Sequence, residues 1–274
     1  MINPESRIDL HIHTSGSDGT WSLTQLLVKL EQTGIEIFSI TDHDSIASVK
    51  ELLARPPEEE RHFIIGAEIS CTYQNREYHL LAYAFNPQEQ ELLELLAYNQ
   101  EQREKYNRTI VKFVQGFTPS VSLKDYLSYQ NPIEKGGWKS LNYLVERGVI
   151  CTIGDFFNLA VECEEKMVFL PPQQVIKVIK GAGGFPFLAH PSAYQGGKLL
   201  PEKDLKEWEG MGIAGIECFS PYLARIKDAD YYLDFCRRNK LMISGGSDCH
   251  GEFSPRELGN PPIKLKQLKL DFIK

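Results

Sequence analysis

The stretch R-I-D-L-H-I-H (7–13) is the part of the 274-residue chain from which the fold can be worked out. Its apolar and polar residues alternate, which predicts a β-strand. Alternate side chains of a strand share a face, so His11 and His13 point the same way, and Asp9 points with them. Two imidazoles about 7 Å apart along a strand can bind one metal ion if the strand ends there. An H-x-H pair alone is more often a pair of surface or strand-end histidines. The positions of the other histidines therefore decide whether this pair belongs to a metal site.

Five apolar runs along the chain each end at a potential metal ligand. The runs and their ligands are 7–13 with His11 and His13, 35–40 with His43, 63–67 with Glu68, 185–189 with His190, and 241–244 with Asp248 and His250. Functional groups of a β/α barrel lie at the carboxyl ends of strands, so these side chains are expected to meet. His79 lies inside its run instead, and His62 precedes its run, which indicates a surface residue. Glu217 fits a buried acid that supports the site and a structural acid equally well.

Short β-rich runs alternate with amphipathic helical patterns over most of the chain. Strands are predicted at 7–13, 36–41, 62–69, 77–85, 184–189, 212–219 and 240–244. Helices are predicted at 22–33, 45–54, 171–181, 203–210 and 224–239, and Ser22 with Gln25 fits a capping box at the start of the first. This order predicts an α/β fold with a parallel sheet or a closed β/α barrel. Seven strands, rather than eight, leave the closure open.

The region from about residue 88 to 172 interrupts this alternation. Its helical or loop segments are predicted at 88–113, 123–129 and 139–147. A stretch of this length without a clear strand is too long for one crossover. We therefore predict a helical insertion subdomain at 99–171, within a barrel domain formed by 1–98 and 172–274.

Composition and charge narrow the function. The formal net charge of −7 argues against binding of extended duplex DNA, because proteins that follow a long polyanion usually have a basic surface. No secretory signal and no membrane-length apolar run is visible. The six cysteines form neither a C-x-x-C pair nor zinc-finger spacing, which favours reduced thiols. We therefore expect a cytoplasmic protein with no membrane partner and no obligate protein partner.

Six motifs, in order, resemble those of the PHP family, named for polymerase and histidinol phosphatase. They are D-L-H-I-H-T-S-G-S-D-G (9–19), I-T-D-H-D (40–44), G-A-E-I-S (66–70), H-L-L-A-Y (79–83), L-A-H-P (188–191) and G-G-S-D-C-H-G (245–251). The resemblance runs from residue 7 to about 256, without the insertion. It implies a distorted (β/α)7 barrel that holds two or three divalent metal ions.

The resemblance also implies the ligands, and every ligand position of the family is filled in this chain. By motif position, the ligands are His11, His13 and Asp248 for a first ion, Glu68 between the first and a second ion, His79 and His190 for the second ion, and Asp18, His43 and His250 for a third. A mixed nitrogen and oxygen set suits Mn²⁺, Fe²⁺ or Zn²⁺ better than Mg²⁺ or Ca²⁺.

These ligands suggest a mechanism of phosphate ester hydrolysis. Two ions about 3.5–4 Å apart can share a water and lower its pKa toward ~7. We expect this metal-bridging hydroxide to attack phosphorus, while the ions hold the phosphate oxygens. Asp9 and Asp42 are candidates for hydrogen bonds that orient imidazoles. An ordinary strand-end or turn acid is an equally good interpretation of each.

The expected substrate is a small phosphate ester. Single-domain members of the family with an insertion at this place resemble nucleotide phosphatases, which suggests a 3′,5′-bisphosphate, and 5′-to-3′ exoribonucleases that act on short RNA. Those relatives tend to have Arg and His in a segment of the insertion that here reads E-K-G-G-W-K-S (134–140). Candidate phosphate contacts are Arg225, Lys135 and Lys139, although each is also typical of a solvated surface charge. Trp138 could stack on a base or pack within the insertion.

Two other functions are compatible with the same metal ligands. A histidinol-phosphate phosphatase would need an acidic group for the amine of its substrate. A non-catalytic metal-bearing module that binds partners or RNA would not need nine ligands. The sequence therefore favours a metal-dependent phosphoric ester hydrolase.

Overall fold

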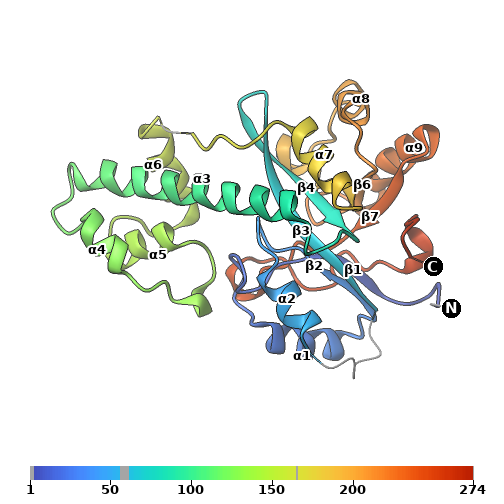
Figure 1. Ribbon diagram of the computed structural model, residues 1–274, viewed down its shortest axis with the longest axis horizontal. Coiled ribbons are helices and arrows are strands. Elements are labelled where there is room, and N and C mark those ends of the chain that lie inside the picture. Colours follow the sequence, from blue (N-terminus) through green and yellow to red (C-terminus); the bar gives the residue numbers. More distant parts are fainter. Residues whose placement is uncertain (1–2, 56–61, 165, 274) are drawn as a thin grey trace.

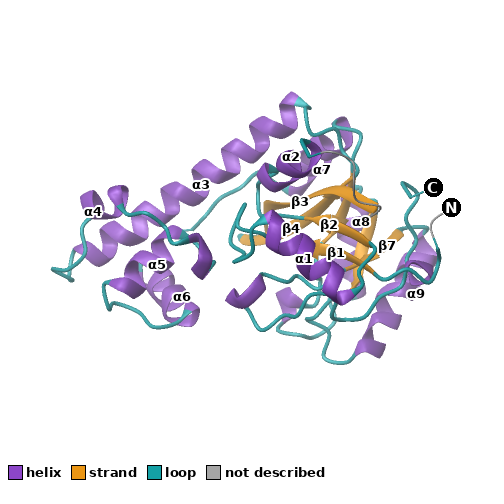
Figure 2. Ribbon diagram, turned by 90° about the horizontal axis from the view of Figure 1, so that it is seen from below, coloured by secondary structure: helices purple, strands orange, loops and turns teal. Residues whose placement is uncertain are grey.

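The centre of the molecule is a seven-stranded sheet whose strands follow one another in chain order (Figures 1 and 2). The computed structural model describes residues 3–55, 62–164 and 166–273, so the outermost residues of the predicted barrel domain, 1–2 and 274, lie outside the described part. The strands are β1 (Ile8–Ile12), β2 (Ile37–Ile40), β3 (His62–Tyr73), β4 (Arg76–Tyr83), β5 (Phe185–Leu188), β6 (Gly215–Phe219) and β7 (Met242–Gly245). Each of them coincides with a predicted strand.

The sheet curves until its first strand meets the chain that follows its last. Beyond the end of β7, Cys249 forms an isolated parallel bridge with Ile12 of β1. The His13 N–H donates to the Cys249 carbonyl over 2.9 Å. This contact brings the two edges together, so the sheet is nearly closed. The prediction of an α/β fold with a distorted seven-stranded β/α barrel is confirmed.

The inverted strand β4 is the distortion. It runs antiparallel to both β3 and β5, whereas the other neighbouring strands are parallel. The strand–helix alternation did not predict this exception. Gln74 (φ 50°) and Asn75 (φ 59°) turn the chain from β3 into β4, and this left-handed backbone is that of a tight hairpin. Because β4 is inverted, its first half lies at the edge where the parallel strands end. His79 therefore reaches this edge from within its strand.

Helices pack around the barrel. They are α1 (Leu23–Thr33), α2 (Ala47–Leu53), α7 (Pro172–Gly181), α8 (Glu202–Met211) and α9 (Ala229–Asn239). The first begins as predicted, because Ser22 and Gln25 form a reciprocal capping box. Its buried leucines follow the three- and four-residue spacing of one helix face, which packs on the barrel core; they are Leu23, Leu26, Leu27 and Leu30.

The insertion between β4 and α7 is helical and projects to one side of the barrel (Figure 1). Its helices are α3 (Gln90–Gln115), α4 (Leu123–Ser128), α5 (Lys139–Glu146) and α6 (Ile153–Glu162). Helix α3 belongs to two hydrophobic cores: Leu92 packs in the barrel core, while Ile110 and Val114 pack in a second core with Tyr143 and Phe156. A division at 99–171 stays a prediction, and α3 crosses that boundary without a break. Among the described residues, none of the helices has the length and apolar character to cross a membrane.

We expect the buried face of α1 to be essential for stability. Leu26 is fully buried, so Leu26→Ala should lower the free energy of unfolding by about 2–5 kcal/mol. Val28 on the same helix is 47% exposed, and Val28→Ala should change it by less than about 0.5 kcal/mol. Urea unfolding of the metal-free variants measures both values. Equal values for the two variants would contradict this assignment of the buried face.

Candidate metal centre

The two histidines of the first strand meet two carboxylates. His11 Nε2 and His13 Nε2 lie 3.1 Å apart. Both nitrogens approach Asp248 Oδ1, at 3.4 and 3.1 Å, and Glu68 Oε2, at 3.2 and 3.1 Å. All four side chains are buried. The H-x-H pair thus converges as the strand pattern predicted, at the point where β1 ends.

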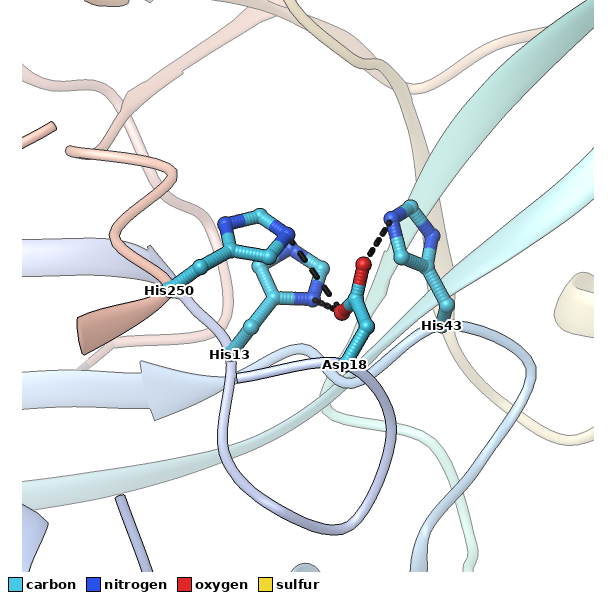
Figure 3. A group of neighbouring side chains, drawn as sticks. All are labelled: His13, Asp18, His43 and His250. Atoms are coloured by element: carbon cyan, nitrogen blue, oxygen red, sulfur yellow. Dashed lines mark ion pairs between the residues drawn. The ribbon is translucent and has the colours of Figure 1, made fainter. Parts of the chain in front are cut away.

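A second group gathers around Asp18 (Figure 3). Asp18 Oδ1 lies 3.5 Å from His13 Nδ1 and 3.4 Å from His250 Nε2, and Asp18 Oδ2 lies 3.9 Å from His43 Nε2. The His13 and His250 rings stack, with centroids 3.9 Å apart. His13 therefore faces Asp248 and Glu68 with one nitrogen and Asp18 with the other.

A third group gathers around Glu68. Its Oε1 lies 3.0 Å from His79 Nδ1 and 2.9 Å from His190 Nε2, and its Oε2 lies 3.2 Å from His43 Nδ1. The structure thus brings all nine predicted ligands into one connected cluster, while His62 is exposed elsewhere. Their assignment to individual ions stays a prediction.

The cluster fits divalent metal ions. Buried polar atoms nearly always have a hydrogen-bond partner. Several buried atoms that face the cluster have none, and they are Nδ1 of His13, His43 and His79 and Oε2 of Glu68. The candidate ligands form three sets, and the ligand atoms within each set lie within 4.8 Å of one another. The first set surrounds Asp18, the second joins the first-strand histidines to Asp248, and the third joins His43 to His79. A metal ion is the partner that satisfies such converging lone pairs.

Electrostatics of the metal-free cluster favour ionised carboxylates. Burial alone would raise the pKa of the Glu68 carboxyl, but the neighbouring imidazoles, His43 and His79 foremost, hold it well below its usual range. For the imidazoles of His13 and His79, burial alone would have the opposite effect and lower the pKa. The carboxylates of Asp248 and Glu68, each with an oxygen 3.1 Å from His13 Nε2, instead raise the pKa of His13 to about 9. Attraction to Glu68 raises the pKa of His79 to about 10.

Two of the candidate ligands have a strained backbone. His190 (φ 25°) and Asp248 (φ 48°) have positive φ angles, which cost free energy for residues other than glycine. Such conformations persist only where the surroundings enforce them. The His190 N–H donates to Glu217 Oε2 over 2.6 Å, and Glu217 Oε1 accepts from His11 Nδ1–H over 2.9 Å. Glu217 thus supports the site, because it leaves His11 Nε2 free to face the cluster.

Asp9 and Asp42 have partners other than those suggested by the sequence. Asp9 accepts hydrogen bonds from backbone N–H groups, those of His11, Ser247 and Gly259, at 2.8–3.2 Å. Asp42 accepts from the Thr14 N–H and the Ser17 hydroxyl, each over 2.7 Å. These bonds hold the loop that carries Asp18. Both acids therefore hold loop segments rather than imidazole rings, because backbone N–H groups and hydroxyls of neighbouring loops face their carboxylates.

The three basic residues proposed for phosphate binding are engaged away from the cluster. Arg225 is 65% exposed and pairs with Asp228 over 2.6 Å. Lys135 pairs with Glu146 over 3.0 Å, and Lys139 donates to a backbone carbonyl of α4. Their interpretation as surface charges fits the structure better.

Two polar side chains that the sequence pattern did not identify also reach the cluster. The Tyr222 hydroxyl donates to Asp248 Oδ2 over 2.6 Å. Arg256 Nη1 lies 3.3 Å from the same oxygen, and its Nη2 lies 3.2 Å from His250 Nδ1. Both residues belong to loops without periodicity, so the only available signal was their position after the ends of β6 and β7.

A cavity of about 430 Å³ opens between the cluster and the insertion. Its lining combines polar side chains at the cluster with aromatic side chains of the insertion, including Asp18, His43, Glu77, His79, Arg103, Tyr106, Trp138, Phe156 and Phe157. The Trp138 and Phe156 rings pack edge to face, with centroids 5.1 Å apart. Trp138 therefore both packs within the insertion and faces the cavity.

Residues 9–167 match the PHP domain family. The chain belongs to the PHP family. A 5′-3′ exoribonuclease of Haemophilus influenzae is 27% identical over 92% of this chain and 93% of its own length. A 3′,5′-nucleoside bisphosphate phosphatase of Chromobacterium violaceum is 25% identical over 94% of each chain. A crystal structure from Bifidobacterium adolescentis, described as a metal-dependent phosphoesterase, has a TM-score of 0.76 at 26% identity and covers 94% of this chain and 92% of its own.

These findings confirm the resemblance carried by the six motifs. As a PHP protein with homologues named as exoribonuclease and phosphatase, the chain is a metal-dependent phosphoesterase, and thus a hydrolase. Its His, Asp and Glu groups are the sites in the described structure that could bind the metal.

We expect metal loading to release protons. With pKa values raised to about 9 and 10, His13 and His79 are protonated near neutral pH, and a metal ion needs their lone pairs. Adding Mn²⁺ to metal-free protein at about pH 7.5 should acidify a weakly buffered solution. The competition by protons weakens as pH rises, so the apparent Mn²⁺ affinity should increase between about pH 6.5 and 8.5. A pH-independent affinity without proton release would contradict the positions of these two imidazoles.

Proposed function

We propose that this phosphoesterase acts on nucleotides, with 3′,5′-bisphosphates or short RNA as its substrates. The cavity that joins the cluster to the insertion carries this proposal, since a nucleotide needs a phosphate site beside a base site. The homologues named as an exoribonuclease and as a nucleoside bisphosphate phosphatase support it.

The aromatic wall suits a nucleobase. Base stacking on aromatic side chains contributes ~1–3 kcal/mol per base and tolerates any base. Phe157 is 56% exposed although it lines the cavity, so its ring is available for contact. Trp138 and Tyr106 supply further aromatic surface beside it. We therefore place the base against the insertion and the phosphate against the cluster.

The nine clustered side chains would hold two or three Mn²⁺, Fe²⁺ or Zn²⁺ ions. When bound, such ions supply a water of lowered pKa and positive charge for the phosphate oxygens. The protein's own part is to fix the ligands and add cationic groups. Arg256 is 24% exposed at the Asp248 side of the cluster, which supports a role for its guanidinium in holding a phosphate oxygen.

The alternatives find less support in the cavity. A histidinol-phosphate phosphatase needs a free acid for the substrate amine. Beyond the ligand Asp18, the acid that lines the cavity is Glu77, and it is already paired with Arg103 over 2.7 Å and with His79 over 3.1 Å. A non-catalytic module would have no use for a complete ligand set.

Six free cysteines support the proposal of a reducing, cytoplasmic environment.

A substrate panel tests this function. We expect Mn²⁺-reconstituted protein to release phosphate or mononucleotides from a 3′,5′-bisphosphate nucleotide or a short 5′-phosphorylated RNA in preference to simple mononucleotides. Asp248→Asn should abolish this turnover, because it removes a carboxylate that faces both first-strand histidines. Turnover of histidinol phosphate alone would move the protein to the alternative. Activity unaffected by Asp248→Asn would show a contaminant.

The base site is tested by two exposed phenylalanines of the insertion. Phe157→Ala should raise KM for a nucleotide roughly 5- to 150-fold, the equivalent of ~1–3 kcal/mol of lost stacking. It should leave hydrolysis of glycerol 2-phosphate, which has no ring to stack, nearly unchanged. The matched control is Phe117→Ala, because Phe117 is 57% exposed on the insertion but does not line the cavity. An equal effect of Phe157→Ala on both substrates would exclude a base site at this wall.

A further inference from the structure

Arg103 connects the insertion to the metal centre. It lies on α3, the helix that runs from the barrel into the insertion (Figure 1). Its Nη2 donates to Glu77 Oε1 over 2.7 Å, and its Nε donates to Asp44 Oδ2 over 3.0 Å. Nη2 also bonds to the Ser70 hydroxyl. One guanidinium thus links three barrel segments that each carry a candidate ligand within two residues.

Glu77 is the partner of Arg103 that touches a candidate ligand directly. Glu77 Oε1 accepts a hydrogen bond from His79 Nε2–H over 3.1 Å. The other ring nitrogen, Nδ1, is buried without a hydrogen-bond partner and lies 3.0 Å from Glu68 Oε1. A proton held on Nε2 leaves the Nδ1 lone pair free for a metal ion. The carboxylate therefore selects the tautomer that can bind the ion.

The Asp44 side of this network fixes the segment that carries His43. Asp44 has a left-handed backbone (φ 47°), and its carboxylate accepts from the Ser70 N–H over 2.9 Å and from the Asn99 amide over 2.7 Å. Asn99 and Arg103 are four residues apart on α3, so they lie on one face of this helix, and both donate hydrogen bonds to the Asp44 carboxylate. The network thus extends from α3 to both His43 and His79.

Arg103 is also needed to keep Glu77 in place. A carboxylate close to the buried Glu68 carboxylate is unfavourable unless a cation offsets its charge. The Arg103 side chain is 28% exposed and that of Glu77 is 25% exposed, so the pair is largely shielded from water. In such surroundings the loss of one partner leaves the other charge without compensation.

We propose that Arg103 and Glu77 are positioning residues of the metal centre: Arg103 holds the Glu77 carboxylate, and this carboxylate holds His79 with Nδ1 aimed at Glu68. The insertion thereby helps to assemble the barrel's metal site as well as one wall of its cavity. This inference depends on the metal centre that the proposed function requires. Its test measures metal binding and needs no substrate.

The test is a Mn²⁺ titration of metal-free protein, with free Mn²⁺ followed by its EPR signal. Glu77→Gln and Arg103→Met should each weaken one bound ion about 10- to 100-fold, the usual effect of removing a group that orients a ligand. In Glu77→Gln the remaining ions should bind as in the wild type, and in Arg103→Met the same ion should be the most weakened, with a smaller effect on an ion held by His43, next to the released Asp44. The double variant should lose little more than the more affected single variant, because the two residues act as one unit.

Arg108→Met is the matched control. Arg108 lies on the same helix and pairs with Glu104 over 2.7 Å, but its side chain is 51% exposed. This variant should keep every Mn²⁺ affinity. Thermal unfolding of the metal-free variants separates positioning from folding, and the nearly isosteric Glu77→Gln carries the test if Arg103→Met does not fold.

Two results would overturn the inference. Wild-type Mn²⁺ affinities in both variants would show that the pair does not position the metal centre. An equal loss for all ions, together with a lower unfolding temperature, would reduce the pair to a packing role. If the wild-type protein itself bound no Mn²⁺, the proposed metal centre would fail instead, which is a distinct outcome.

Discussion

The buried Glu68 carboxylate is the interaction on which the architecture of the site depends. Its two oxygens lie 2.9–3.2 Å from nitrogens of five imidazoles, those of His11, His13, His43, His79 and His190. An ionised carboxylate inside a barrel costs several kcal/mol unless opposite charge and hydrogen bonds compensate it. Strands from all parts of the sheet must therefore end around one point. Positive φ angles at His190 and Asp248 are part of the cost of that convergence.

The insertion is joined to the barrel at the site itself. The Gly137 N–H donates to the Asp18 carbonyl over 2.7 Å, beside the ligand group that Asp18 organises. Gly136 has a φ of 65°, and a Cβ there would lie 2.7 Å from the Phe253 side chain, so only glycine allows this approach. The aromatic wall of the cavity is thus held at a fixed place relative to the metal ligands. Under the proposed function, this arrangement would let the protein recognise phosphate and base together.

The sequence by itself predicted the strands and most of the residues that cluster at their ends. Apolar runs of strand length, each followed by a histidine or an acid, predicted where the strands end and which side chains meet there. The capping box at Ser22 fixed the start of α1 in the same local way. These features depend on neighbours within a few residues, so periodicity and spacing were sufficient for them, whereas Asp18, His79 and the closed barrel were implied only by the resemblance to the family. The ordered motifs then indicated the family, and the family indicated the chemistry.

Tertiary structure decided the direction of β4 and the partners of the charged side chains. Strand pattern alone does not distinguish a parallel neighbour from an antiparallel one, so the place of His79 followed only from the register of the hairpin. Asp9 and Asp42 bind backbone amides, and Arg103 reaches Glu77 across 26 residues of chain. Long polar side chains take partners from whichever segment folding brings near. The periodicity and spacing of residues do not predict such contacts, because the contacts form only when the barrel closes and α3 packs against it.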